Sequence, residues 1–150
     1  MNVTVTIDEP GFLQSIKECF QQVKVPCQTA MAEAFRDVVY ANLGDDGQQD
    51  KPVWDLLSKP YAKRVGRTEA TLRLTPEEAK RVKGDPNLLY DSTGINVTNP
   101  EFATVYNNCK YAEVHQETRR FFPVIGDEVT PITKDICVAA CERVLEERLK

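Results

Sequence analysis

The sequence has little of what metal centres and membrane proteins need. It holds one histidine among 150 residues, and none of its five cysteines forms a Cys-x-x-Cys pair. A zinc site of two cysteines and two histidines is therefore excluded. No apolar run approaches the roughly 18 residues of a membrane-spanning helix, and the N-terminus lacks a basic segment followed by an apolar one. We expect a soluble globular chain in a reducing compartment, folded as a single domain over residues 1–150, without a cofactor, a metal or a membrane contact.

Motifs of catalysis are missing as well. The chain has no nucleophile elbow, no phosphate-binding loop and no paired-carboxylate signature. Cys109 lies six residues before His115, and the pair could act as nucleophile and base only if a third group oriented the imidazole. Cys137 and Cys141 share a helix face and could supply half of a metal site, or fill a core as small apolar residues. We expect structural roles for all four and no catalytic residue; the alternative is a small cytosolic Cys-His hydrolase.

The net charge of −4 is unevenly distributed along the chain. Residues 1–50 carry three Lys/Arg against eight Asp/Glu, whereas residues 59–83 carry eight basic residues against three acidic ones. This asymmetry suits head-to-tail contact between copies of the chain, or a surface near nucleic acid. A solvated loop and helix face would give the same pattern.

The first third of the chain predicts a strand and a long helical region. Val3 to Ile7 alternates with period two and is β-branched, which is typical of a strand. Apolar residues at helical spacing follow from Phe12 onward. Pro26 removes a backbone donor inside this pattern, so we expect one long kinked helix or two helices in tandem, ending at Gly44.

From about residue 45 to residue 73 the periodicity fails. Pro52 and Pro60 argue against regular structure around them. Trp54, Leu57 and Tyr61 are nevertheless apolar anchors within this stretch. We interpret the stretch as a long extended loop, a mobile arm that becomes ordered on contact with a partner.

The remainder of the chain predicts short elements and a final helix. Thr75, followed by proline and by Glu78 at the third helical position, is a helix-start signal. Residues 95–97 and 103–106 predict two strands of a hairpin, and residues 132–149 predict an amphipathic C-terminal helix. The order indicates an α+β fold, in which a small antiparallel or mixed sheet packs against the long N-terminal helix and the C-terminal helix.

Aromatic and basic side chains are dense between residues 111 and 122. The stretch Tyr111-Ala112-Glu113-Val114-His115-Gln116 is followed by Arg119, Arg120, Phe121 and Phe122. Arginine and aromatic residues are enriched at interface hot spots, which favours a subunit contact. The two phenylalanines could instead complete the core, and along an extended segment both interpretations can hold.

Four motifs occur in a fixed order along the chain: Trp54…Leu57-Ser58…Tyr61, Leu89…Asp91-Ser92-Thr93-Gly94, Tyr111-Ala112-Glu113-Val114-His115-Gln116, and Arg120-Phe121-Phe122. The C-terminal helix closes the series. This arrangement, from about Trp54 to the end, resembles the virion morphogenesis and tail-completion proteins of tailed bacteriophages. In that family a W-x-x-L-S-x-x-Y arm precedes an L-x-D-T-G turn, and Y-A-x-x-H-Q and P-x-R-P-F segments lead into the last helix.

The resemblance implies a structural virion protein: a ring-forming subunit at the head-tail junction or at the tail end, with six copies. The implied partners are further copies of the chain, connector or adaptor proteins and tail-tube proteins, with DNA passing nearby without sequence-specific binding. The implied location is the virion, and the host cytoplasm during assembly. Together with the residue types, this predicts an interface that comprises Trp54, Leu57, Tyr61, Lys63, Arg64, Arg67, Arg119, Arg120 and Phe121.

Overall fold

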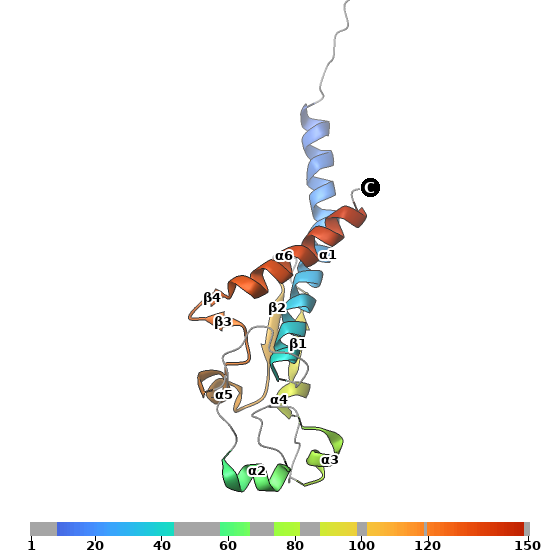
Figure 1. Ribbon diagram of the computed structural model, residues 1–150. Coiled ribbons are helices and arrows are strands. Elements are labelled where there is room, and N and C mark those ends of the chain that lie inside the picture. Colours follow the sequence, from blue (N-terminus) through green and yellow to red (C-terminus); the bar gives the residue numbers. More distant parts are fainter. Residues whose placement is uncertain are drawn as a thin grey trace, which may run out of the picture.

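The computed structural model describes residues 9–43, 58–66, 74–81, 88–98, 102–118 and 120–148 (Figure 1). The predicted strand at residues 3–7 and most of the predicted arm lie outside these ranges. The described part contains a long helix that ends near α4 (Leu88–Asp91), a second helix that crosses it, two small antiparallel sheets and several short helices. The predicted α+β class is confirmed.

Helix α1 (Glu9–Leu43) is a single helix of 35 residues that continues through Pro26. The alternative of two helices in tandem is therefore wrong. A proline inside a helix costs about 3 kcal/mol because it removes one hydrogen bond and crowds the preceding turn. Cys27, directly after Pro26, is buried, and packing around it offsets that cost in this chain.

Helix α6 (Pro131–Arg148) crosses α1 and makes the main contact between elements of the chain (Figure 1). The Cys137 thiol donates to the Met31 carbonyl at 3.5 Å, and the Cys27 thiol approaches the Cys141 carbonyl at 3.9 Å. Residue numbers fall along α1 as they rise along α6, so the two helices run in opposite senses. The predicted C-terminal helix is confirmed within one residue at either end.

Strand β1 (Thr93–Asn96) pairs with β2 (Thr104–Asn107) in the predicted antiparallel hairpin. Gly94 lies opposite Tyr106, and a Cβ atom at residue 94 would meet the tyrosine oxygen at 2.7 Å, so the phenol ring occupies the place of a side chain. A second, unpredicted hairpin joins β3 (Val124–Ile125) to β4 (Glu128–Val129). Gly126 has φ 61° in its two-residue turn, a conformation that favours glycine.

The core gathers at the C-terminal end of α1, where the short helices α4 (Leu88–Asp91) and α5 (Ala112–Thr118) close over it. Its buried members are Val39, Leu43, Leu89, Cys109 and Phe121. Phe35 and Phe122 pack beside them with ring centroids 6.0 Å apart. The core thus draws on α1, α4 and the segments flanking α5, while α6 covers α1 further toward its N-terminus.

A separate small cluster joins α2 (Lys59–Val65) to the segment before α3 (Pro76–Ala79). Val65 and Leu74 are buried there, beside Tyr61. Pro60 occupies the first turn of α2, where a missing N–H costs nothing. The expectation that Pro60 prevents regular structure is therefore wrong. The predicted capping box is confirmed, because the Thr75 and Glu78 side chains bond reciprocally to each other's backbone N–H groups.

Candidate assembly surfaces

The Gln116 side chain holds the segment that follows α5. Its Oε1 accepts hydrogen bonds from the backbone N–H groups of Phe121 and Phe122, at 3.1 and 2.9 Å, and its Nε2 donates to the Phe122 carbonyl at 3.2 Å. One amide therefore satisfies three backbone groups of an irregular segment. The glutamine of the Y-A-x-x-H-Q stretch is thereby a clamp for the following Arg-Phe-Phe, a role that the residue order alone does not indicate.

A second amide ties the same segment to α1. Asn42 is fully buried, and its Nδ2 donates to the Phe121 carbonyl at 2.9 Å. The Phe121 side chain is 1% exposed and lies in the core. Of the two interpretations of this phenylalanine, the structure supports the core role, and Phe121 has no free surface to offer a partner.

Asn107 and Thr93 link the hairpin to the helices. The Asn107 amide donates to the Thr93 hydroxyl at 2.8 Å, and its oxygen accepts from the Cys109 backbone N–H at 2.9 Å. The Tyr40 hydroxyl on α1 donates to the Thr93 carbonyl at 3.0 Å, and its ring stacks on Tyr90 at 4.4 Å. The threonine of the Asp-Ser-Thr-Gly turn is thus a buried junction between α1 and β1.

Cys109 and His115 lie in different surroundings. The Cys109 side chain is 7% exposed and belongs to the core cluster. The half-buried His115 ring packs edge-on against Tyr111, with centroids 5.5 Å apart. A substrate would have to enter the core to meet the thiol. The hydrolase alternative stays an untested prediction.

The thiols along the α1–α6 crossing are chemically shielded. Burial raises the pKa of the Cys137 thiol. Burial also raises the pKa of the Cys27 thiol, and the neighbouring Cys141 adds to this rise. No group of three or more His, Cys, Asp or Glu within the described residues is placed to hold a metal ion. None of the described helices has the length and hydrophobicity of a membrane span.

The predicted interface residues are spread over separate places. Trp54, Leu57, Arg67 and Arg119 lie outside the described residues. On α2, Lys63 and Arg64 are exposed, and the Arg64 guanidinium lies 5.3 Å from the centre of the half-buried Tyr61 ring. Arg120 is half-buried next to the core, and its Nε has no hydrogen-bond partner. The structure therefore brings Tyr61 and Arg64 together but places Arg120 and Phe121 elsewhere, beside α5.

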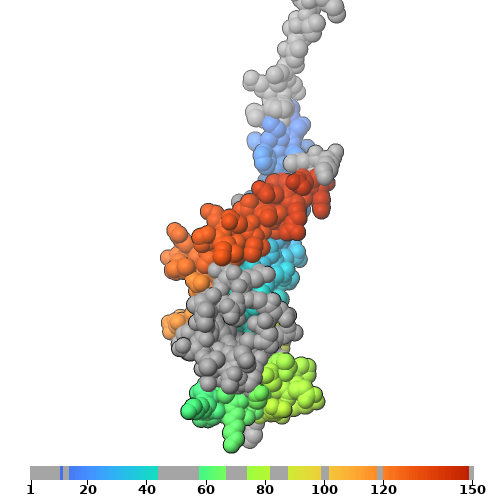
Figure 2. All heavy atoms as spheres, in the orientation of Figure 1, coloured from blue at the N-terminus to red at the C-terminus, as the bar shows by residue number. Residues whose placement is uncertain are grey.

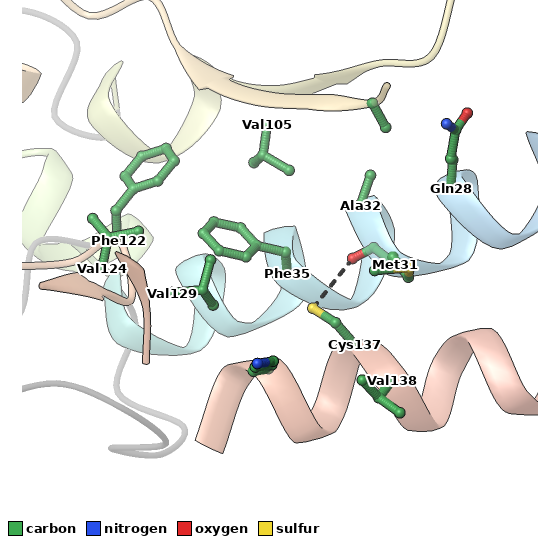
Figure 3. A pocket seen from close by; sticks show the side chains of 12 residues that line it. Gln28, Met31, Ala32, Phe35, Val105, Phe122, Val124, Val129, Cys137 and Val138 are labelled. Carbon is green, nitrogen blue, oxygen red and sulfur yellow. Dashed lines mark hydrogen bonds between the residues drawn. The ribbon is translucent and has the colours of Figure 1, made fainter. Parts of the chain in front are cut away.

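An open apolar groove of about 520 Å³ lies where α1, β2, the β3–β4 hairpin and α6 meet (Figure 3). Figure 3 shows Val105 from β2, Phe35 from α1 and Phe122 gathered toward one end of it, and Val138 on the α6 side. Its rim carries large apolar side chains that remain exposed, among them Met31, Val129 and Val138. Lys134 is the one charged residue among those that line it.

The N-terminal end of α1 carries another exposed apolar side chain, Phe20. This end projects beyond α6 (Figures 1 and 2). Residues 17–22 are exposed throughout, and the Phe20 side chain retains 67% of its surface in solvent. The sequence predicted this helix face, but not that it would extend past the rest of the described chain.

Comparison with known proteins finds no family model, no curated protein and no solved structure that matches this chain. The resemblance to tail-completion proteins therefore stays a prediction, and the functional argument depends on the residues and their geometry.

Proposed function

We propose that this chain is a structural protein of a tailed-bacteriophage virion. In this proposal it forms a ring of six copies at the head-tail junction or at the tail end. Further copies of the chain, connector or adaptor proteins and tail-tube proteins are its partners, and DNA passes through the ring without sequence-specific recognition. It acts within the virion and, during assembly, in the host cytoplasm.

The exposed apolar surface is the observation that supports this proposal most directly. Met31, Val129 and Val138 stay partly in water along the groove, and Phe20 stays in water at the projecting end of α1. Contiguous exposed apolar surface marks interaction sites in soluble proteins. Gln116 and Thr93, which lie in the motifs that carry the resemblance, and Asn42, which donates to Phe121 of the last motif, hold backbone segments together. Such roles suit a structural protein, in which side chains maintain the shape of the chain.

Trp54→Ala tests the proposal in the encoding phage. We expect the variant to fold, because Trp54 belongs to the stretch that the sequence predicts as an arm, but to leave filled heads and tails unjoined because the apolar anchor is missing. Circular dichroism measures folding and electron microscopy measures particle joining on the same variant. Trp54→Phe is the matched control and should retain joining. Normal virions from Trp54→Ala would contradict the arm as an assembly element.

A further inference from the structure

A projecting helix end with the exposed Phe20 and an open apolar groove both face solvent on this chain. We propose that the projecting end of α1 in one copy docks in the groove of a second copy, with Phe20 as the main anchor. The inference deepens the proposed self-assembly by naming the contact between copies, although the contact can be tested on the purified chain alone.

Helix α1 carries an apolar stripe that continues beyond the part of the helix on which α6 packs. Leu13, Ile16, Phe20 and Val23 follow the spacing i, i+3, i+7 and i+10, which is the anchor pattern of a helix that lies in an apolar groove. Val23 is 8% exposed, whereas Phe20, one turn earlier, is 67% exposed. The stripe is thus continuous with the buried face of α1 that packs on α6, and Phe20 lies in the part of it that remains in solvent.

The groove offers the complementary wall. Met31 on α1, Val129 on β4 and Val138 on α6 line it and remain partly in solvent. Gln28 also lines it, and the Gln28 Oε1 atom is buried without a hydrogen-bond partner. A buried amide oxygen that lacks a donor destabilises its surroundings.

Charges at matching positions define how the two surfaces meet. Lys17 lies three residues before Phe20 on α1, and Asp135 lies three residues before Val138 on α6. Both charged side chains are exposed. Residues three apart share a helix face, so placing Phe20 against Val138 with the helices parallel brings Lys17 to Asp135. An exposed pair of this kind contributes little affinity but selects the register.

The contact is heterologous, because the helix end and the groove are different parts of the same chain. A copy that docks its helix end still has an empty groove, and its partner still has a free helix end. Such contacts close into a ring if the rotation permits, and otherwise continue as a filament. A ring is the arrangement that the proposed function requires.

Two single variants and their mixture test the contact. Phe20→Ser removes the anchor at little helix cost, since serine and phenylalanine have similar helix propensities, and Val138→Lys places a charge in the groove. We expect the native chain to associate in sedimentation velocity and each variant to dissociate at least about 30-fold more readily, as for a hot-spot loss of about 2 kcal/mol. Mixed in equal amounts, they should form a dimer that does not grow, because one intact helix end meets one intact groove.

Matched controls separate the contact from general surface effects. Val114→Ser removes an exposed apolar side chain from α5, and Ile132→Lys adds a charge to α6 at a residue that does not line the groove. Both should associate like the native chain. Val129→Lys on β4 is a second groove variant if Val138→Lys fails to fold by circular dichroism. Lys17→Asp should weaken association up to about fivefold, and Asp135→Lys in the partner should restore it.

Several results would overturn the contact. A native chain that stays monomeric at high concentration would do so. Normal association of Phe20→Ser would show that another segment, such as the one around Trp54, fills the groove. Association of Val138→Lys with itself, but not of Phe20→Ser, would indicate two helix ends paired with each other. A chain that associates through this contact but never joins phage particles would leave the contact standing and overturn the virion assignment instead.

Discussion

The two ends of α1 carry the same kind of pattern in opposite environments. Near the C-terminal end, Val38, Val39, Asn42 and Leu43 are at most 1% exposed, because the short helices and the segment after α5 close over them. Near the N-terminal end, residues 17–22 are exposed and Phe20 is largely in water. One helix therefore serves as the centre of the core and as a surface that extends past it. The comparison shows that an apolar helix stripe indicates burial against another surface, but does not indicate whether that surface belongs to the same chain or to another one.

The largest expected effect is a difference in the free energy of unfolding between variants at the two ends of α1. Leu43→Ala should lower the free energy of unfolding by about 2–5 kcal/mol, since it leaves a cavity in the core. Phe20→Ala should change the free energy of unfolding by less than about 0.5 kcal/mol, because the Phe20 side chain is exposed to water in both the folded and the unfolded chain. Urea denaturation of both variants at dilute, monomeric concentrations measures the difference. Similar losses for both variants would show that Phe20 is covered within its own chain.

The second largest effect should come from Gln116, the clamp that holds the Phe121–Phe122 segment over the C-terminal end of α1. Gln116→Ala leaves the Phe121 and Phe122 backbone groups without their partner and should cost about 1–3 kcal/mol. Gln116→Glu is the matched control: it keeps an acceptor for the two N–H groups but loses the donor to the Phe122 carbonyl, so its loss should be smaller. Denaturant midpoints and the hydrogen-exchange rates of the two N–H groups report the effect. Unchanged exchange in Gln116→Ala would contradict the clamp.

The crossing with α6 marks the boundary between the two ends. Cys137 is buried there, as predicted for the inner face of the last helix, and Cys141 is half-buried. Cys137→Ala should cost about 1–2 kcal/mol, and Cys141→Ala should cost less because its side chain is less buried. Cys19→Ala, on the exposed end of α1, should be close to neutral. Stoichiometric zinc in the purified protein would contradict a purely structural role for Cys137 and Cys141.

The smallest effect is a pH dependence of the same crossing. The folded-state pKa values of Cys27 and Cys137 are raised. Above the ordinary cysteine pKa of about 8.5, the unfolded chain has released protons that the folded chain still holds, so stability is full below this pH and falls as the pH rises. The thermal midpoint should drop between about pH 8 and pH 10, and less so in the Cys27→Ala/Cys137→Ala double variant.

Thiol labelling checks the same comparison directly. With an alkylating reagent at neutral pH, the exposed Cys19 should react first, because the reagent reaches it without any opening of the fold. Cys27 and Cys137 should react slowly, since they are buried and hold their protons more tightly. Mass spectrometry of timed samples gives the order. Rapid labelling of Cys27 would indicate that the crossing opens readily.

Local signals in the sequence were sufficient for several elements. The Thr-Pro-x-Glu pattern predicted the capping box at Thr75, and the period-two stretches predicted the β1–β2 hairpin. The C-terminal helix followed from its apolar stripe and start signal. Each depends on residues within about one turn or one strand pair of one another, so no distant contact had to be known.

Residues whose partners lie far along the chain could not be assigned this way. Asn42 bonds a carbonyl 79 residues away, and Asn107 holds a threonine across the hairpin. An asparagine in a helix or strand pattern looks the same whether it is solvated or buried. For the groove, α1, β2, the β3–β4 hairpin and α6 had to meet before its apolar side chains became neighbours.

Pro26 and the apolar stripe of α1 show most clearly what the sequence determined and what the tertiary structure decided. The sequence alone determined that residues 12–43 favour an amphipathic helix and that proline weakens it at residue 26. Only the tertiary structure decided that the helix continues, since the packing of Cys27 and its neighbours against α6 offsets the lost hydrogen bond. The same crossing decided which part of the stripe is covered. Val23 and Cys27 are buried within the chain, and Phe20, beyond the crossing, remains exposed to solvent.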